Sequence, residues 1–370
     1  MENFYIINKA GKVLLSKNIS GKKLDENLFL GFSSSTSNFC QSLFEENIKE
    51  VITSDSKILF REVGNYLFVL HSSLNIGSYV LKTIIKDIEE LCEFIFGKSS
   101  EWNNSFTDFN GIQDILCNQM LELSPTIIVK GIKKISIEEN VQERLDKLLS
   151  VFENQDGICS NSSLIILGES ILHSRFSLHE SRMILQYYKA RPISTQKFLY
   201  IPVYLQENWC NLYFVKMQSY IFVFKSFIDK PFSIFKQSVE EFRISLIQSR
   251  LDIPIEEPPV LLRLFAKREV FALLYINIKT GNTIFPKLRP GPEIQQREII
   301  NIFWNFYHQT CSLIKIPGVN EISITKDQYR FYAKTENMHR IFILFSSEYI
   351  KPENIDTATN EILRNIKFYK

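Results

Sequence analysis

The sequence predicts an α+β fold in which one order of strands and helices occurs three times. Short apolar runs rich in aromatic and β-branched residues alternate with polar turns, which is typical of antiparallel strands. Two such runs, a helix-like segment, three further runs and an amphipathic helix follow one another near residues 1–125, 126–252 and 260–370. We therefore predict three tandem domains, each a five-stranded antiparallel sheet flanked by helices.

Length and composition agree with several folded domains. The chain has 370 residues, which is more than one ordinary hydrophobic core accommodates. Its hydrophobic content is 45%, and with only 13 Gly and 12 Pro it favours short loops over long linkers. The 43 Lys and Arg residues nearly balance the 41 Asp and Glu residues, so we do not expect a nucleic-acid-binding protein built on a basic face.

The strand pattern is clearest in residues 197–227. Three apolar runs there are separated by polar breaks at residues 206–208 and 216–219. A membrane-spanning helix needs about 20 nearly uninterrupted apolar residues. The breaks therefore predict an antiparallel meander of three strands.

The first repeat opens with a hairpin and closes with the most regular helix of the chain. The expected elements are strands at 4–8 and 13–15, a helix at about 24–44, and a meander at 48–53, 58–63 and 66–71. In the closing helix, apolar residues recur at steps of three and four: Leu81, Ile84, Ile85, Ile88, Leu91, Cys92 and Ile95. A further helix is expected at 112–123, whereas the pattern at 130–140 assigns no element.

The second repeat is preceded by a helix at 141–152 and opens with a hairpin at 163–167 and 170–173. Ser177 and Glu180 have the spacing of a capping box at the start of a helix that runs to about residue 189. After the meander, a helix is expected whose inner stripe is Phe235, Val239, Phe242 and Leu246.

The third repeat follows a proline-rich spacer at 254–259. Its expected elements are strands at 270–278 and 283–285, a helix from 292 to about 313, a meander at 321–325, 329–334 and 340–345, and a last helix opened by Pro352.

No motif for catalysis is found. The sequence has no P-loop, no G-x-S-x-G and no H-E-x-x-H, so we expect no catalytic residue and no cofactor. His173, His179 and Glu180 could form part of a metal site, but surface positions at a strand end and a helix start explain them better, and no metal ligand is predicted. Cys210 follows Trp209 without an identifiable base, which favours a buried structural cysteine.

Two charged pairs and the cysteines complete the list of candidates. Glu256–Glu257 lies between prolines and is predicted to be solvated. Lys267–Arg268 is either a solvated strand edge, which we favour, or a contact for anionic lipid or an acidic partner. The six cysteines form no C-x-x-C pair and the N-terminus has no signal-peptide pattern, so we expect a reducing, cytoplasmic setting.

The repeated order resembles the longin fold, and three in tandem resemble the tri-longin proteins, which act in pairs as exchange factors for Rab-family GTPases. Two blocks carry the similarity in letters. They are Ile201–Leu205 with the two strands after it, and Leu273–Ile276 with Phe285, Pro286, Gly291, Pro292, Arg297 and Asn305–Tyr307. Their spacing is similar to the branch of the family that acts in planar cell polarity and ciliogenesis.

This resemblance implies a non-catalytic subunit that pairs with an Inturned-like longin protein and binds a Rab-family GTPase. It also implies a location in the cytoplasm and at the cilium base, with peripheral membrane contact. The first domain would supply the binding surface through its long helix, with Leu24, Leu28, Phe29, Phe32 and Phe39 as the candidate residues. The alternative is that these residues, which exceed the needs of one buried stripe, pack only on their own sheet.

Two other functions are compatible with the same pattern. One is another tri-longin subunit, of the Mon/Ccz or Hermansky–Pudlak type, in endolysosomal traffic. The other is a vesicle coat or tethering adaptor, which would bind only the GTP-loaded GTPase and leave nucleotide release unchanged.

Overall fold

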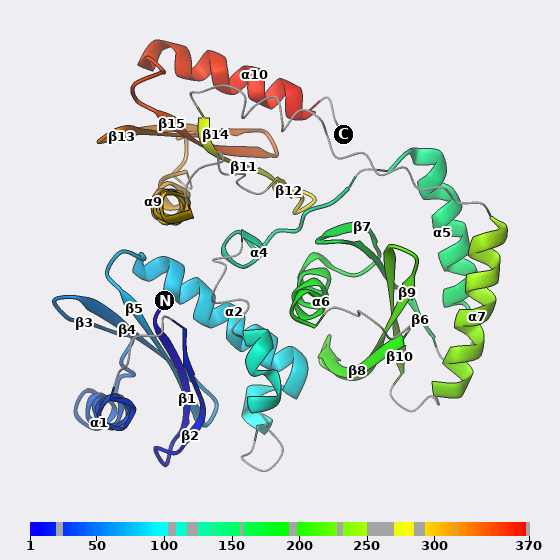
Figure 1. Cartoon of the computed structure of the whole chain (residues 1–370), viewed down its shortest axis with the longest axis horizontal. Helices are drawn as coiled ribbons and strands as arrows, with labels where there is room; N and C mark the ends of the chain where they lie inside the picture. Colours follow the sequence, from blue (N-terminus) through cyan, green and yellow to red (C-terminus); the bar gives the residue numbers. More distant parts are fainter. Residues whose placement is uncertain are drawn as a thin grey trace. The chain divides into compact units, whose positions relative to one another are not determined.

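The computed structural model describes residues 1–19, 25–102, 109–116, 125–135, 137–155, 158–191, 198–227, 232–249, 270–284, 293–314 and 316–367. Within these residues the chain forms three five-stranded sheets, and every pairing between neighbouring strands for which a register is given is antiparallel (Figure 1). The strand orders are β2-β1-β5-β4-β3, β7-β6-β10-β9-β8 and β12-β11-β15-β14-β13. The same order in all three sheets confirms the α+β fold of three longin-like repeats.

The elements of the three repeats are as follows. The first contains β1 (Asn3–Asn8), β2 (Val13–Asn18), α1 (Glu26–Phe44), β3 (Glu50–Ile52), β4 (Ser56–Val63), β5 (Tyr66–Ser73) and α2 (Ser78–Phe96), followed by the short α4 (Pro125–Ile128). The second contains α5 (Glu139–Glu153), β6 (Ile158–Leu167), β7 (Ser170–Ser174), α6 (Leu178–Ala190), β8 (Phe198–Leu205), β9 (Asn208–Met217), β10 (Tyr220–Phe227) and α7 (Phe232–Gln248). The third contains β11 (Val270–Asn277), β12 (Thr283–Ile284), α9 (Glu293–Leu313), β13 (Glu321–Lys326), β14 (Tyr329–Glu336), β15 (His339–Ser346) and α10 (Ile355–Lys367).

The first strand of each repeat lies inside its sheet, between the second strand and the fifth, and the fifth is the central strand. In the first sheet Phe4 stands opposite Leu70 on one face and Tyr5 stands opposite Val69 on the other, and all four side chains are buried. Side chains of a strand alternate between the two faces. Both faces of the central strands are therefore apolar, and both need a cover.

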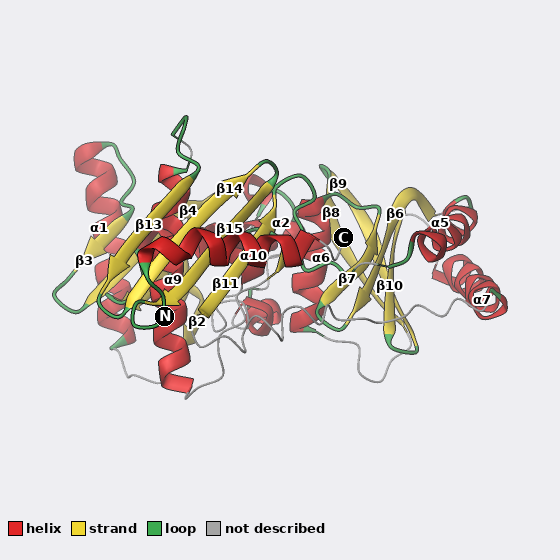
Figure 2. Ribbon diagram, turned by 90° about the horizontal axis from the view of Figure 1, so that it is seen from above, coloured by secondary structure: helices red, strands yellow, loops and turns green. Residues whose placement is uncertain are grey.

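Helices supply a cover on each face of each sheet (Figures 1 and 2). In the first repeat α1 packs on the face that carries Tyr5 and Ile7, and α2 packs on the other. In the second, α5 and α7 lie side by side on one face, and α6 covers the opposite one. In the third, α10 and α9 take the two faces, and Phe306 of α9 stacks on Phe331 with ring centroids 4.3 Å apart.

The local signals that predicted α6 and its neighbours are confirmed in detail. The backbone N–H of Ser177 donates to Oε2 of Glu180 at 2.9 Å, and the N–H of Glu180 donates to Oγ of Ser177 at 3.3 Å, which is a capping box. The polar breaks of the central meander are two-residue turns, with Gln206 and Glu207 both at positive φ. Such turns match the twist of the strands they join.

The chain divides into two compact units. One comprises Met1–Val129, Gln186–Pro192 and Val203–Trp209, and the other comprises Lys130–Leu185, Ile193–Pro202 and Cys210–Lys370. The domain boundaries 1–125, 126–252 and 260–370 stay a prediction.

The second unit contains a segment that the sequence pattern left unassigned. The N–H of Ile132 donates to the carbonyl of Gly281 at 3.1 Å, and the N–H of Thr283 donates back to the carbonyl of Ile132 at 2.9 Å. One residue further, the N–H of Ile171 donates to the carbonyl of Lys133 at 2.8 Å. The segment thus pairs with β12 on one side and β7 on the other, and it covers one edge of two different sheets.

Substituting Gly131 by Ala should weaken this segment. A Cβ at Gly131 would lie 2.3 Å from Cγ2 of Thr283, whose side chain is 1% exposed and has no room to move. We expect a loss of about 1–3 kcal/mol in the free energy of unfolding, measured as a lower urea midpoint. The matched control is Gly31→Ala in α1, where nothing lies within 4 Å and the change should be neutral or stabilising. An unchanged midpoint for Gly131→Ala would show that the segment is not tightly packed.

Acid should destabilise the third repeat through His308. This side chain of α9 is buried, and burial lowers its pKa from 6.5 to about 4. Between these values the unfolded chain binds a proton that the folded chain does not, so stability falls as the pH drops from 6.5 towards 4, by at most about 3 kcal/mol. Thermal unfolding of wild type and His308→Leu across this range should show a flatter pH profile for the variant, and parallel profiles would contradict this assignment.

Candidate partner-binding surface

Helix α1 is a long helix without charges in its body. Residues 27–44 contain no Asp, Glu, Lys or Arg. The helix begins where Oδ1 of Asp25 accepts a hydrogen bond from the N–H of Leu28 at 3.1 Å, and it ends at Glu45, which adopts a left-handed conformation with φ of 54°. Carboxylates at the start of a helix are favourable because they compensate the helix dipole. The helix dipole gives no such stabilisation to the carboxylate of Glu45 at the end of α1.

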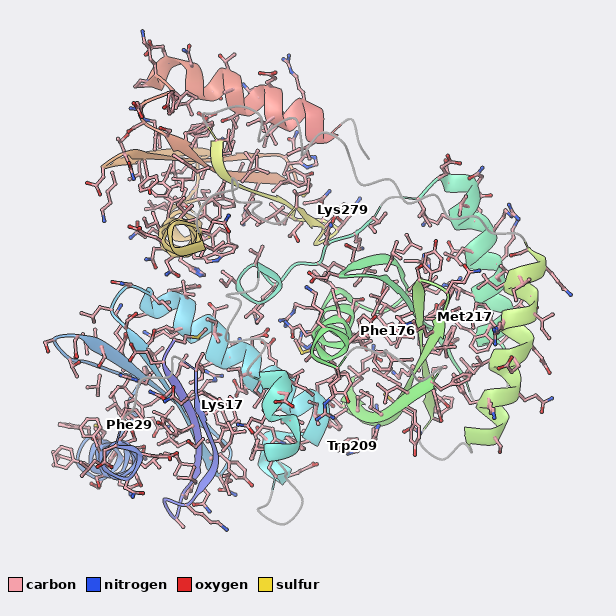
Figure 3. All side chains as sticks on the ribbon, viewed as in Figure 1. Lys17, Phe29, Phe176, Trp209, Met217 and Lys279 are labelled. Carbon is pink, nitrogen blue, oxygen red and sulfur yellow. The ribbon has the colours of Figure 1, made fainter. Side chains whose placement is uncertain are left out.

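The inner side of α1 packs on the first sheet. Phe29 and Leu30 are buried, and the Phe29 ring lies 5.1 Å from that of Tyr5 and 5.6 Å from that of His71 (Figure 3). Burial, and to a smaller extent the charge of Glu26, raises the pKa of Tyr5 to about 12. The inner side of α1 is therefore already covered by the first sheet.

The outer side of α1 is also apolar, and it is exposed. Leu28, Phe32, Phe39 and Leu43 are 72%, 45%, 58% and 59% exposed. With Ser35 they follow one another at steps of four, three, four and four residues, which places them on one side of a helix, opposite the buried side. We call these five residues the outer α1 stripe. Phe44, 61% exposed, extends it through an edge-to-face contact with Phe39 at 6.2 Å.

A polar pocket of about 400 Å³ borders α1 along one flank. It lies between α1 and the ends of the neighbouring strands and is lined by Ile7, Asn8, Lys9, Ser34, Ser37, Asn38, Gln41, Glu62, Tyr66 and Leu67. Because α1 contributes only serine and amide side chains to the pocket, the apolar surface of the helix is confined to the outer stripe and the buried side.

The structure separates the predicted residues into two groups. Leu28, Phe32 and Phe39 belong to the outer stripe, whereas Phe29 packs on its own sheet. Leu24 lies outside the described residues. Leu43 and Phe44 were not predicted, although Leu43 continues the helical period four residues after Phe39.

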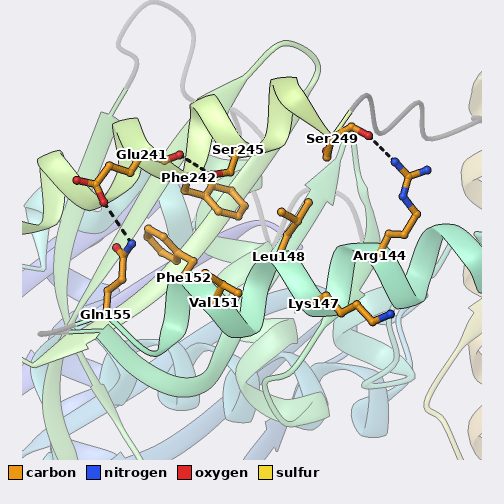
Figure 4. Close-up of a pocket in the computed structure, with 10 residues that line it drawn as sticks. All are labelled: Arg144, Lys147, Leu148, Val151, Phe152, Gln155, Glu241, Phe242, Ser245 and Ser249. Carbon is orange, nitrogen blue, oxygen red and sulfur yellow. Dashed lines mark hydrogen bonds between the residues drawn. The ribbon is translucent and has the colours of Figure 1, made fainter.

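A second groove lies between α5 and α7 (Figure 4). Its volume is about 390 Å³ and its floor is formed by Leu148, Phe152 and Phe242. Arg144 closes one end by donating to the carbonyl of Ser249, and Gln155 closes the other by donating to Glu241 at 3.5 Å. These contacts tie α5 to α7, and the groove is largely explained by the packing of the two helices.

His173 belongs to an ion network and not to the partial metal site considered above. Its Nε2 lies 3.3 Å from Oδ1 of Asp146, and Arg175 bridges Asp146 at 3.0 Å and Glu153 at 2.5 Å. Burial lowers the pKa of His173 despite the nearby Asp146. Glu180 is engaged in the capping box, and no three His, Cys, Asp or Glu side chains gather as metal ligands in the described part of the chain.

Of the remaining candidates, the structure describes Cys210 and Trp209. Burial raises the pKa of the Cys210 thiol to about 11, so it is protonated at neutral pH and a poor nucleophile. Trp209 is 40% exposed and lies over Gly97, where an added Cβ would be 3.0 Å from its ring. The pairs Glu256–Glu257 and Lys267–Arg268 lie outside the described residues.

No protein-family model matches this chain, and no curated protein matches its sequence. Among the described residues, no helix combines the length and the hydropathy required to cross a membrane.

Truncating Phe29 and truncating Phe32 in α1 should have effects of very different size on stability. Phe29→Ala removes a buried ring and should lower the free energy of unfolding by about 3–5 kcal/mol. Phe32→Ala, three residues away and exposed, should change it by less than about 0.5 kcal/mol. Urea unfolding of both variants measures the difference, and a comparable loss in Phe32→Ala would mean that the outer stripe is covered within the chain.

Proposed function

We propose that this chain is a non-catalytic subunit of a heterodimeric complex of the Fuzzy–Inturned type, which binds a Rab-family GTPase and promotes nucleotide exchange or membrane recruitment. Three longin-like repeats support the family, and the outer α1 stripe is the observation that carries the binding role. The two sequence blocks around residues 201–205 and 273–307 support the Fuzzy branch. Planar cell polarity, ciliogenesis and a location at the cilium base follow from that branch.

An exchange factor of this kind needs differential binding and no reacting group. It must bind the nucleotide-free GTPase more tightly than the loaded form. A hundredfold acceleration corresponds to about 2.7 kcal/mol of such preference. Full burial of one Phe side chain contributes about 1.5–3 kcal/mol, so Phe32 and Phe39 can anchor the complex through the outer α1 stripe. The preference itself must come from contacts that differ between the nucleotide-free and the loaded GTPase.

Two alternatives use the same surface. Another tri-longin subunit, of the Mon/Ccz or Hermansky–Pudlak type, would pair with a different longin protein on endolysosomal membranes. A coat or tethering adaptor would bind a GTP-loaded GTPase and leave its nucleotide release unchanged.

The experiment is a pull-down with the tagged full chain from its own cytosol, followed by an exchange assay with the recovered proteins. We expect recovery of a longin-containing partner and a small GTPase, and faster release of labelled GDP when both subunits are present. The double variant Phe32→Asp, Phe39→Asp should lose partner recovery at least tenfold. Ile244→Asp, at an equally exposed apolar position on α7, is the matched control and should retain it.

The outcomes separate the candidate functions. Recovery of endosomal Rab proteins with another longin subunit would favour the first alternative. Binding of the GTP form without faster release would favour the adaptor. A chain that is recovered alone, with wild type and double variant behaving alike, would overturn the proposal.

A further inference from the structure

The second repeat shows how this chain covers a helix in the position of α1. Along the chain, helix α6 comes between the second and third strands of its repeat, as α1 does in the first repeat. All eight of its residues 180–187 are buried. Near its C-terminal end Gln186 donates a buried hydrogen bond to Asp87 of α2 at 3.1 Å, and the Tyr187 ring lies 6.5 Å from that of Phe94. Gln186 and Tyr187 of this helix are thus packed against another helix.

The outer α1 stripe has the shape to receive a helix in the same way. From Leu28 to Leu43 it extends roughly 22 Å at the rise of an α-helix. Its steps of four and three residues form a continuous ridge. Ser35 lies between Phe32 and Phe39 and leaves room for a second helix to approach closely. A loop tip would cover only part of this length.

Acidic residues mark both ends of the stripe. Asp25 and Glu26 precede the uncharged residues 27–44, and Glu45 and Glu46 follow them. All four side chains are exposed. A complementary helix therefore has an uncharged, apolar centre and basic residues at its ends, about 28 Å apart for the spacing of Glu26 and Glu45.

The same charges argue against two other occupants. In an antiparallel pair of two copies, Asp25 and Glu26 would face Glu45 and Glu46 at both ends, and in a parallel pair Glu45 would face its equivalent. Like charges that face one another across a pair of helices repel. Helices that lie on anionic membranes carry Lys and Arg beside their apolar face, whereas α1 has none.

We propose that the outer α1 stripe binds one helix of a different polypeptide, apolar in the centre and basic at both ends. The inference rests on the proposed function in that it identifies this polypeptide as the other subunit of the heterodimer. The stripe supplies the buried area, and the acidic ends select the partner and keep copies of this chain apart.

A variant of the same chain can serve as the probe. Asp25→Asn keeps a helix-capping side chain, and Glu26→Lys, Glu45→Lys and Glu46→Lys make both ends of α1 basic. This basic-ended variant presents the helix that the proposal describes. Mixed with the wild-type chain it should form a one-to-one pair, at least about tenfold tighter than either protein with itself. Analytical ultracentrifugation of the two proteins, separate and mixed, measures this.

The pair should weaken as salt is raised to about 0.5 M, and Phe32→Asp in either chain should abolish it. Mixtures that associate no more than the separate proteins would overturn the proposal. Self-association of the wild type that Phe32→Asp removes would assign the stripe to a second copy. Wild-type binding to phosphatidylserine vesicles that Phe32→Asp removes would assign it to a membrane.

This test and that of the proposed function fail independently. If the charge-swapped pair forms and the pull-down recovers no longin subunit and no GTPase, the stripe is a helix-binding surface in another complex. If the exchange complex is recovered and the charge-swapped pair does not form, the proposed function stands and the proposal of a basic-ended helix on the stripe is overturned.

Discussion

The pairing of the first strand with the fifth is the constraint on which each repeat depends. β1, β6 and β11 each hydrogen-bond to the fifth strand of the repeat, β5, β10 or β15, which comes after three other strands and a helix along the chain. Closing such a loop costs entropy before any contact is gained. The pairing of the first strand with the fifth offsets this entropy because side chains on both faces become buried. Tyr5 on one face and Phe4 on the other are examples. Each sheet then needs a cover on both faces, and the helices before and after the meander provide them.

Sequence patterns identified these elements because each is specified locally. The capping box of Ser177 and Glu180, the polar breaks at residues 206 and 218, and the period of α2 depend on neighbours within one turn or one hairpin. The segment at Ile132–Lys134 depends on edges more than 35 and nearly 150 residues further along the chain, and it has only isolated bridges. Alternation over two or three residues carries no strand signal, so this segment could not be assigned from sequence.

The sequence locates the exposed apolar side of α1 only in part, because Leu28, Phe32 and Phe39 belong to it and Phe29 does not. Phe29 and Phe32 differ by three positions and lie about 60° apart around a helix, yet one is 8% and the other 45% exposed. Which of two apolar rings meets the sheet is set by how α1 sits on β1 and β5, and hydrophobicity alone does not encode that orientation. Phe44 presents the same difficulty, since its exposure depends on where the sheet ends.

Helix α1 has two apolar sides, one that packs on its own sheet and one that is exposed. Helices α5 and α7 carry charged residues such as Lys147, Glu240 and Arg243 beside their exposed apolar ones. In α1 residues 27–44 carry no charge, the outer side is apolar, and the flank along the polar pocket is serine and amide. The acidic groups stand only at the ends and do not interrupt the outer α1 stripe. The stripe is thus exposed in this chain, as the proposed binding to a second chain requires.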